Sequence, residues 1–156
     1  MRVFVSYSVA DVDLLHQVVG TIRAGGDEPL CWDTSKVPGQ EVWQSIFAWI
    51  ASADLMVVII TDQTVSRAMS VGQEVGRARA KGKPIVPLVS SDVKPGDLGG
   101  LKGVIYQPIS REQTQQALAG VARVIEGMKL KKAEEQRQLL MVGGIVGLLW
   151  LFGNDG

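Results

Sequence analysis

The sequence is poor in the residue types on which several common chemistries depend. It holds one cysteine and one histidine among 156 residues, so no internal disulfide can form. Neither CxxC nor HExxH occurs, and we therefore expect no metal site and no Ser-His-Asp catalysis. Cys31 lies in the apolar run PLCW and is interpreted as a small buried hydrophobe. His16 falls in the middle of an expected helix and is interpreted as an ordinary surface histidine.

The sequence also lacks a net charge of either sign. Lysine and arginine together number 16, as do aspartate and glutamate, so the formal net charge is zero. A protein that binds nucleic acid normally carries a basic excess that neutralises phosphates, and we therefore expect no nucleic-acid partner. Neither GxGxxG nor GxxxxGK followed by Ser or Thr occurs, so the usual phosphate-binding loops are absent from the sequence.

The N-terminal segment lacks the features of a signal peptide. MRVFVSYS has one positive charge and becomes polar after a short apolar run. The use of a single cysteine fits a reducing compartment. We therefore expect the domain to lie in the cytoplasm.

What the sequence does contain is a regular alternation of strand-like and helix-like segments. Five short apolar runs predict strands, at residues 2–7, 29–32, 55–61, 82–89 and 104–108. Apolar residues at helical spacing predict helices, the first ending at Gly25 and Gly26 and the last opening with a capping-box sequence at residues 110–113. This alternation predicts an α/β domain, with a doubly wound five-stranded parallel sheet, over residues 1–128.

Polar and aromatic residues follow the strands of this expected sheet. Ligands of an open parallel sheet bind at the carboxyl ends of its strands, near the point where the strand order reverses. The first expected strand ends at Tyr7 and Ser8, and the second leads into a loop with Asp33 and Lys36. The third leads through a polar segment to the helix that bears Glu74. We therefore expect these side chains to line one rim that suits a polar small molecule with a ring.

Three blocks of the sequence, taken in order, resemble a TIR (Toll/interleukin-1 receptor) domain over nearly all of residues 1–128. They are FVSYS at the first strand, then CWDTSKVPGQEVWQSIFAWIASADLMVVIIT, then the run from Ser66 through VGQEVGRARAKGKPIVPL. The middle block is similar to the family's strand, BB loop and helix, with Asp33, Pro38 and Gly39 at the expected spacing. The resemblance implies the flavodoxin-like TIR fold, and the chain resembles bacterial-type, NAD-cleaving TIR proteins with a C-terminal hydrophobic tail.

The resemblance implies an activity. Some TIR domains break the nicotinamide–ribose bond of NAD⁺, and their essential glutamate on the third helix matches Glu74. Breaking this bond develops oxocarbenium character on the ribose, which a carboxylate stabilises, and nicotinamide leaves as a neutral group without a general acid. The implied products are nicotinamide with ADP-ribose or a cyclic ADP-ribose isomer, and NAD⁺ is a substrate, so no cofactor is expected. The implied setting is immune defence or cell suicide, activated by self-assembly.

The resemblance also implies further pocket residues, each with a simpler alternative. Tyr7 and Ser8 match the strand end that lines the family's nucleotide pocket, although Tyr7 also suits core packing and Ser8 a strand-end cap. Asp33 and Lys36 match the start of the BB loop, which gates the pocket, although Asp33 also suits a turn. Ser70 stands in the pocket position, four residues before the glutamate, where the family's enzymes often carry tryptophan. The glutamate itself could otherwise be a solvated helix carboxylate.

Two other functions stay open on the sequence. The chain could be a non-catalytic TIR adaptor that assembles with other TIR proteins at a membrane, with Glu74 incidental. Alternatively, the TIR domain could sense a nucleotide signal while the C-terminal tail disrupts membranes. Release of nicotinamide from NAD⁺ distinguishes the enzyme from both.

The last part of the sequence differs in composition from the α/β region. Residues 129–138 form a charged run, expected to be a helical linker, and residues 139–153 form an uncharged apolar run, expected to be a hydrophobic helix. As a helix this apolar run reaches about 22 Å, against about 30 Å of hydrocarbon in a bilayer. Basic residues precede it, so the positive-inside rule predicts an anchor at the inner face of the cell membrane. A buried oligomerisation helix is the alternative, and either role would cluster the chains as a homo-oligomer.

Overall fold

The fold was analysed in a computed structural model of the whole chain. The structure describes residues 1–32, 40–62, 68–94, 107–110 and 112–152, and within these ranges it leaves out the side chains of residues 9, 40–41, 68–70 and 142–152. The chain divides into two compact units, Met1–Ala122 and Arg123–Gly156.

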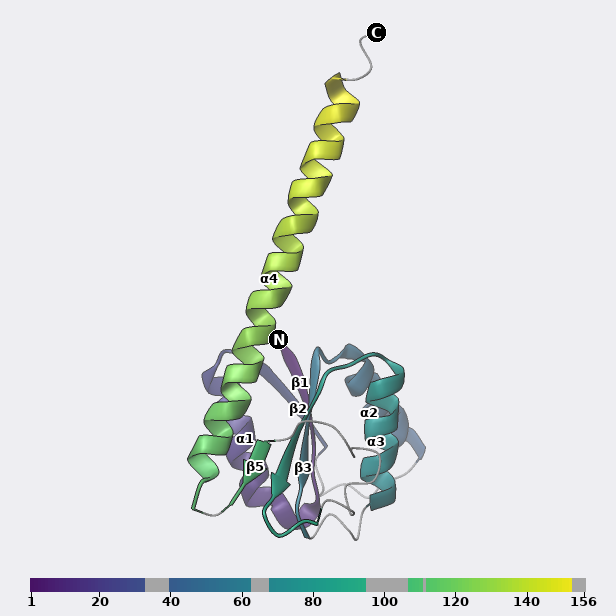
Figure 1. Cartoon of the computed structure of the whole chain (residues 1–156). Coiled ribbons are helices and arrows are strands. Elements are labelled where there is room, and N and C mark those ends of the chain that lie inside the picture. The colour runs from purple at the N-terminus through teal and green to yellow at the C-terminus, as the bar shows by residue number, and fades with distance from the viewer. Residues whose placement is uncertain (33–39, 63–67, 95–106, 111, 153–156) are drawn as a thin grey trace. The chain divides into compact units, whose positions relative to one another are not determined.

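A five-stranded parallel sheet forms the centre of the first unit (Figure 1). Its strands lie in the order β2-β1-β3-β4-β5, which is the flavodoxin-like order, and the predicted fold class is confirmed. The strands are β1 (Arg2–Ser6), β2 (Glu28–Cys31), β3 (Leu55–Ile60), β4 (Ile85–Ser90) and β5 (Gln107–Ile109). The fifth was expected at 104–108, and residues 104–106 of that run lie outside the described part of the chain. The strand order reverses beside β1, between β2 and β3, so β1 and β3 border the place where such sheets bind ligands.

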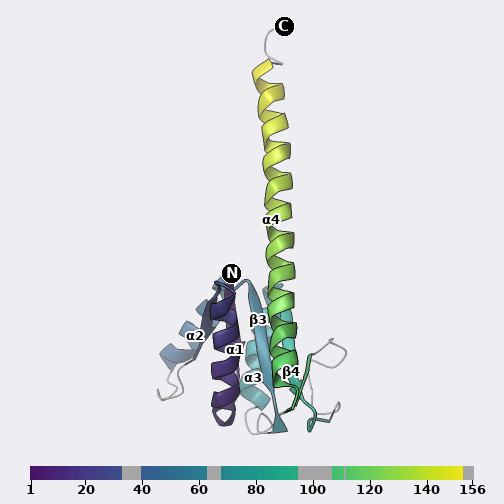
Figure 2. The same cartoon turned by 90° about the vertical axis from the view of Figure 1, so that its left-hand side faces the viewer.

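Helices cover both faces of this sheet (Figures 1 and 2). The short helix η1 (Val9–Asp11) and α1 (Val12–Ala24) follow β1, and α1 shares its face of the sheet with the first turns of α4 (Thr114–Phe152). The other face carries α2 (Gln40–Ser52) and α3 (Ala68–Ala80). This two-sided cover explains why all six residues of β3 are buried, as the uninterrupted apolar run LMVVII predicts.

The hydrophobic core on the α2–α3 face is built from alternate residues of the strands. Phe4 of β1, with Met56 and Val58 of β3, packs in one cluster with Ile50 of α2 and Val75 of α3. Because successive strand residues point to opposite faces, the partner set that includes Val3, Val5 and Val57 faces α1. Trp43 and Trp49 of α2 are half-buried and pack against the edge of the cluster.

Two helices end in the same way, and in both the end fixes where the next strand begins. After the last residue of α1, Ala24, comes Gly25 and then Gly26, which has φ +77° and donates its N–H to the carbonyl of Arg23 at 2.9 Å. The next N–H, that of Asp27, reaches the Ile22 carbonyl at 3.2 Å. Gly82, with φ +63°, repeats the arrangement after α3. Glycine is required at such left-handed positions because a side chain would clash with the backbone there.

One of the two hydrogen bonds of the predicted capping box is seen just before α4. Ser110 Oγ accepts a hydrogen bond from the backbone N–H of Gln113 at 3.2 Å, and the Ser110 carbonyl accepts one from the Thr114 hydroxyl at 2.9 Å. These bonds satisfy groups that the helix itself leaves without partners, so they set the point at which the helix begins.

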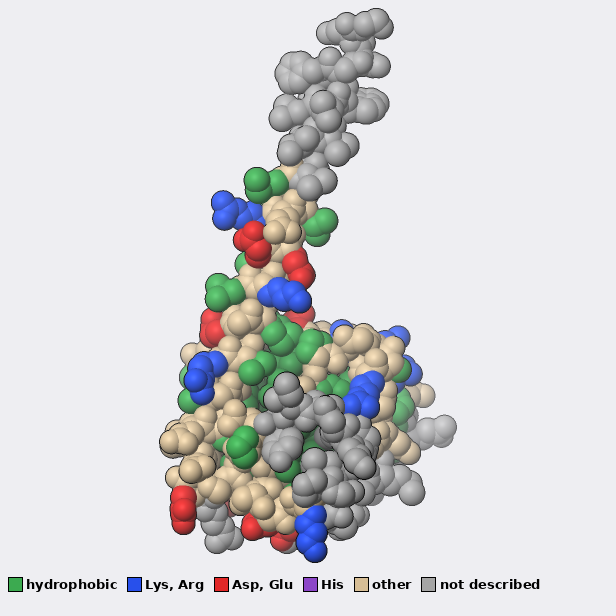
Figure 3. Space-filling model, in the orientation of Figure 1, with side chains coloured by type: hydrophobic (Ala, Val, Ile, Leu, Met, Phe, Trp, Pro, Cys, Tyr) green, Lys and Arg blue, Asp and Glu red, His purple; other side chains and the backbone are tan. Residues whose placement is uncertain are grey.

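The second unit is described as helix from Arg123 to Phe152, the continuation of α4. Charged and large hydrophobic side chains alternate along its described surface (Figure 3). Among the side chains that the structure describes in this unit, the large hydrophobic ones that are more than half exposed are Leu130, Leu139, Leu140 and Met141. The helix α4 runs from Thr114 to Phe152 without a break at 128 or 138, so the helix itself marks no boundary there. The predicted division into a domain at 1–128, a linker at 129–138 and an apolar helix at 139–153 stays a prediction.

The prediction of a membrane anchor is wrong. Among the described residues, no helix is long and apolar enough to cross a membrane. The apolar run is about 8 Å shorter, as a helix, than the hydrocarbon layer, and lengthening it toward the N-terminus brings in the charged residues of 129–138.

Candidate functional site

The candidate site begins at the last residue of β1, Ser6. This serine pairs in register with Val58 of β3, so its backbone is held inside the sheet at the strand-order reversal. It shares the α2–α3 face with Phe4, two residues earlier, because strand side chains alternate. Ser6 is buried, and a buried hydroxyl needs a hydrogen-bond partner to offset its loss of water.

That partner is Glu74 of α3. Val71, Val75 and Ala78 are buried against the core, and Glu74 lies on the same face of the helix, one turn after Val71. Its side chain is only 6% exposed, which excludes the simple reading of a solvated helix carboxylate. The Ser6 hydroxyl donates a short hydrogen bond to Glu74 Oε2. Helix periodicity and strand alternation therefore bring a carboxylate and a hydroxyl together at the carboxyl end of β1.

A small hollow lies over this pair of residues. Its volume is about 10 Å³, close to the space that one water molecule needs. The lining residues come from β1, its carboxyl end, the end of β2, α2 and α3: Phe4, Val5, Ser6, Tyr7, Trp32, Ile46 and Glu74. The hollow thus places a carboxyl group beside three aromatic residues, Phe4, Tyr7 and Trp32.

Tyr7 ties the ends of two neighbouring strands together. Its hydroxyl donates a hydrogen bond of 2.6 Å to the backbone carbonyl of Trp32, the residue that follows β2. The Trp32 ring in turn packs against Trp49 of α2, with 6.1 Å between the ring centroids and 39° between the planes. Tyr7 is buried, so it takes part in packing and lines the hollow at the same time.

The structure brings together some of the predicted site residues. Tyr7 and Glu74 line the same hollow. Ser8 is buried next to it and precedes η1, where its carbonyl accepts the N–H of Asp11 at 2.8 Å, but its side chain makes no cap hydrogen bond. Ser70 lies in the first turn of α3, with its side chain outside the description, and Asp33 and Lys36 lie outside the described residues altogether.

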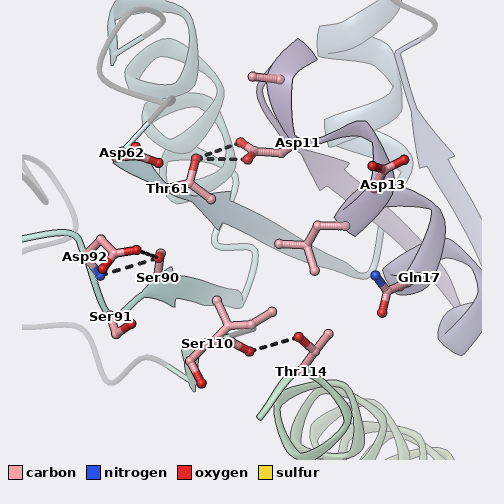
Figure 4. Close-up of a pocket in the computed structure, with 13 residues that line it drawn as sticks. Asp11, Asp13, Gln17, Thr61, Asp62, Ser90, Ser91, Asp92, Ser110 and Thr114 are labelled. Carbon is pink, nitrogen blue, oxygen red and sulfur yellow. Dashed lines mark hydrogen bonds between the residues drawn. The ribbon is translucent and has the colours of Figure 1, made fainter. Parts of the chain in front are cut away.

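A second and larger cavity lies at the same end of the sheet, on the α1 side (Figure 4). Its volume is about 410 Å³, within the range of small-molecule pockets. It is lined by residues that follow β1, β3, β4 and β5 and by the first turns of α1 and α4, namely Ala10, Asp11, Asp13, Leu14, Gln17, Thr61, Asp62, Ser90, Ser91, Asp92, Ile109, Ser110 and Thr114. The expected single rim is therefore divided into two hollows by the sheet itself.

Asp11 and Thr61 form the wall of the larger cavity nearest the strand-order reversal. The Thr61 hydroxyl lies 3.0 and 2.9 Å from the two carboxylate oxygens of Asp11 (Figure 4). Burial raises the pKa of Asp11 above its ordinary value of 3.8, and the nearby Asp62 carboxylate adds to this rise while the Thr61 hydroxyl opposes it. Within the described part of the chain, no three histidine, cysteine or acidic side chains gather in a group that could hold a metal ion.

Sequence reasoning missed Ser6 in the smaller hollow and Asp11 in the larger one. A signal was present for Ser6, because the alternation of β1 places it on the same face as the buried Phe4. Trp32, the last residue of the second expected strand, lines the smaller hollow, as the rule for the carboxyl ends of parallel strands predicts.

Comparison with known proteins supplies the family. The sequence matches the family described as TIR domain over residues 3–125. No curated protein gives a significant match.

Solved structures of the same fold are more distant. A TIR domain heterodimer of RPS4 and RRS1 gives a TM-score of 0.62 at 14% identity, over 81% of this chain and 97% of that one. A CMP N-glycosidase of Clostridium botulinum, BcmB, gives 0.57 at 16% identity, over 78% and 98%. The TIR domains of the activated Roq1 resistosome give 0.51 at 16% identity, over 79% and 84%. At these identities the similarities show a shared fold.

Proposed function

This chain belongs to the TIR domain family, and we propose that it cleaves the nicotinamide–ribose bond of NAD⁺ with Glu74 as the catalytic carboxylate. The products are nicotinamide with ADP-ribose or a cyclic ADP-ribose isomer. The single observation that carries the proposal is the burial of Glu74 beside the carboxyl end of β1, at the strand-order reversal. A carboxylate at such a place needs a reason beyond solubility, because burying a charge costs free energy.

The chemistry needs one anion close to the ribose. As the bond to nicotinamide breaks, positive charge develops on the sugar, and a fixed carboxylate stabilises that charge without having to reorganise. The leaving group departs as neutral nicotinamide, so no acid has to protonate it. Glu74 lies in the apolar shell of Phe4 and Ile46, where a charge interacts more strongly than in water.

Aromatic contact with the substrate is assigned to Trp32 and Tyr7. Ser70 stands where the family's enzymes often carry tryptophan, and a serine offers no ring for stacking. Trp32 lines the hollow of Glu74 from the end of the neighbouring strand. We assign Ser8 and Ser70, with Asp33 and Lys36 from the loop after β2, to the same nucleotide pocket, as the family resemblance implies.

Self-association is part of the proposal. The hollow at Glu74 has a volume of about 10 Å³, too small for a dinucleotide, so the site needs further walls or a rearrangement before NAD⁺ can bind. Two of the structural neighbours are a TIR heterodimer and the TIR domains of a resistosome, and TIR–TIR contacts are the simplest source of such walls. A role in immune defence, with activation by assembly, follows from this proposal. The neighbour named as a CMP N-glycosidase shares the fold only, so the proposal does not depend on it.

The test is direct. The full chain is incubated with NAD⁺ over a range of protein concentrations, and nicotinamide is measured by chromatography. We expect release that rises more steeply than protein concentration, and a loss of at least about 100-fold in Glu74→Gln, which keeps the shape but removes the charge. Glu126→Gln is the matched control, because Glu126 is an exposed carboxylate on α4 that lies 2.8 Å from Lys129 Nζ and does not line the hollow of Glu74.

Two results would overturn the proposal. If no nicotinamide appears at any protein concentration, NAD⁺ cleavage is excluded, and the non-catalytic TIR adaptor becomes the favoured function. If Glu74→Gln cleaves NAD⁺ as fast as the parent, the catalytic group lies elsewhere.

A further inference from the structure

One polar side chain is out of keeping with the strand that carries it. Among the residues of β1 that face α2 and α3, Phe4 belongs to the hydrophobic core, and Ser6 takes the next place on that face. Ser6 is 2% exposed. An apolar residue here would extend the core, whereas a hydroxyl stabilises the fold only when it is hydrogen-bonded.

The two partners in that hydrogen bond are held by separate, rigid elements. Ser6 ends a strand that is paired on both sides, to β2 and to β3. Glu74 is held by α3, whose neighbours Val71 and Val75 are packed into the core. The strand pairing on one side and the packed helix on the other hold the two backbones in place, so the bond between the side chains can fix the direction of the carboxylate.

We propose that Ser6 is the positioning residue of Glu74: its hydroxyl, donated to Oε2, holds the carboxylate in one rotamer toward the hollow beside Tyr7 and Trp32. This inference rests on the proposed NAD⁺ cleavage. Ser6 acts through Glu74 and forms no bond to the substrate. It deepens the proposed site by naming a residue on which the ordering of the catalytic group depends.

The direction of the hydrogen bond matters for the chemistry. An ionised carboxylate only accepts hydrogen bonds, so a serine that donates to it favours the anion over the neutral acid. The anion is the form that stabilises positive charge on the ribose. A donor fixed in the ground state also removes the cost of orienting the carboxylate during the reaction, which is the way preorganised sites gain rate.

The experiment is a series of substitutions at Ser6 with steady-state NAD⁺ kinetics on the full chain. Ser6→Ala removes the donor, and we expect kcat to fall by about 10- to 100-fold, the range for a lost hydrogen bond to a charged group, with KM within about threefold. Ser6→Thr keeps the hydroxyl on a residue that strands favour and should retain kcat within about threefold. Ser6→Cys, a weaker donor, should fall between them. If Ser6→Ala does not fold, a higher kcat in Ser6→Thr than in Ser6→Cys still supports the inference, and the reverse order contradicts it.

Two controls separate positioning from general damage. Ile22→Val removes one buried methyl group on the α1 face, and its kcat should match that of the parent at equal loss of stability. In the Glu74→Ala background, adding Ser6→Ala should change kcat by less than about twofold, because the group that it positions is gone. Losses that multiply in the double variant, or an unchanged kcat in Ser6→Ala, would overturn the inference.

A second readout keeps this inference distinct from the proposed function. Urea midpoints are measured for the parent, Ser6→Ala, Glu74→Ala and the double variant. We expect Ser6→Ala to shift the midpoint clearly less in the Glu74→Ala background than in the parent, since the two side chains share one bond. If no variant and no parent cleaves NAD⁺ but this coupling is present, the proposed function fails while the Ser6–Glu74 pairing stands. Additive midpoints would refute the pairing whatever the activity.

Discussion

The hydroxyl of Thr61 and the carboxylate of Asp11 join the ends of the two central strands, at 3.0 and 2.9 Å from the two carboxylate oxygens. Thr61 directly follows β3, and Asp11 ends the short helix that follows β1. This contact lies on the α1 side of the sheet, opposite the face on which Ser6 contacts Glu74. At this end of the sheet, a hydrogen-bonded carboxyl group therefore lies on each face, Asp11 on the α1 side and Glu74 on the opposite side.

Asp11 should make the stability of the fold depend on pH. Its pKa is raised in the folded chain, chiefly by burial, so the folded state keeps a proton that the unfolded state has already lost. As pH rises from the ordinary value of 3.8 through the raised value, the free energy of unfolding therefore falls. Asparagine cannot ionise, so Asp11→Asn does not lose stability in this way. The melting temperature of Asp11→Asn minus that of the parent should therefore increase across the same pH window and keep its higher value at neutral pH.

Thr61→Val should widen the pH range over which stability falls, whereas Asp11→Asn should remove that fall. The Thr61 hydroxyl lowers the pKa of Asp11, so its removal should raise that pKa further and extend the window to higher pH. Melting curves from pH 3 to pH 8, recorded by circular dichroism, would measure both variants. Parallel pH profiles for the parent and Asp11→Asn would contradict the assignment.

Tyr7→Phe should loosen the end of β2 with little effect on the rest of the fold. The variant loses the 2.6 Å hydrogen bond to the Trp32 carbonyl but keeps the buried ring. We expect a loss of about 1 kcal/mol in the free energy of unfolding, from urea denaturation, and a higher KM for NAD⁺ because Trp32 is less firmly held. Thr21→Ala is the comparison, since it deletes an exposed hydroxyl bond on α1 and should cost almost nothing. Equal effects from both would show that the Tyr7 bond has no special weight.

Two glycine substitutions should change stability in opposite directions. Gly82 has φ +63°, a left-handed conformation that costs an alanine about 1 kcal/mol or more, so Gly82→Ala should destabilise the fold. Gly20 lies within α1, and an added Cβ would meet nothing within 4 Å. Gly20→Ala should therefore stabilise by up to about 1 kcal/mol, as alanine favours the helix. Thermal denaturation of both variants and the parent tests this: the melting temperature should fall in Gly82→Ala and rise in Gly20→Ala.

The exposed hydrophobic residues of the second unit should contribute to self-association. Leu139, Leu140 and Met141 are 73%, 76% and 60% exposed, which is unfavourable for large apolar side chains that have no partner. Replacing all three with glutamine should lower the mass measured by light scattering and reduce NAD⁺ cleavage at a given concentration. A paired change of Lys131 and Glu135 to glutamine, which removes an exposed contact of 4.0 Å, should alter neither. An unchanged mass in the triple variant would exclude this segment from the assembly.

Much of the fold could be predicted because its signals are local. The apolar run of β3 is buried at every residue, and Gly26 ends α1 where the pattern places a stop. The membrane anchor is predicted from the apolar character of residues 139–153, and the preceding basic residues predict only its orientation. Whether such a run can cross a bilayer depends on its length, and no helix among the described residues is long and apolar enough.

The site could be predicted less well, for a geometric reason. Sequence order tells which residues follow each strand, but it does not tell which face of the sheet they take once the strand has ended. Thr61 and Glu74 belong to successive elements, yet one bonds to Asp11 on the α1 side and the other to Ser6 on the opposite side. The importance of Ser6 emerges only when the alternation of β1 and the helical face of α3 are considered together.

The pairing of β1 with β3 has one further consequence. A slip of one residue between these strands would turn every side chain of β1 to the opposite face. Ser6 would then point away from Glu74, and Phe4 would leave the core at the same time. The register between β1 and β3 therefore sets both the packing of the core around Phe4 and the contact between Ser6 and Glu74, so a chain with this register slipped would lose both together.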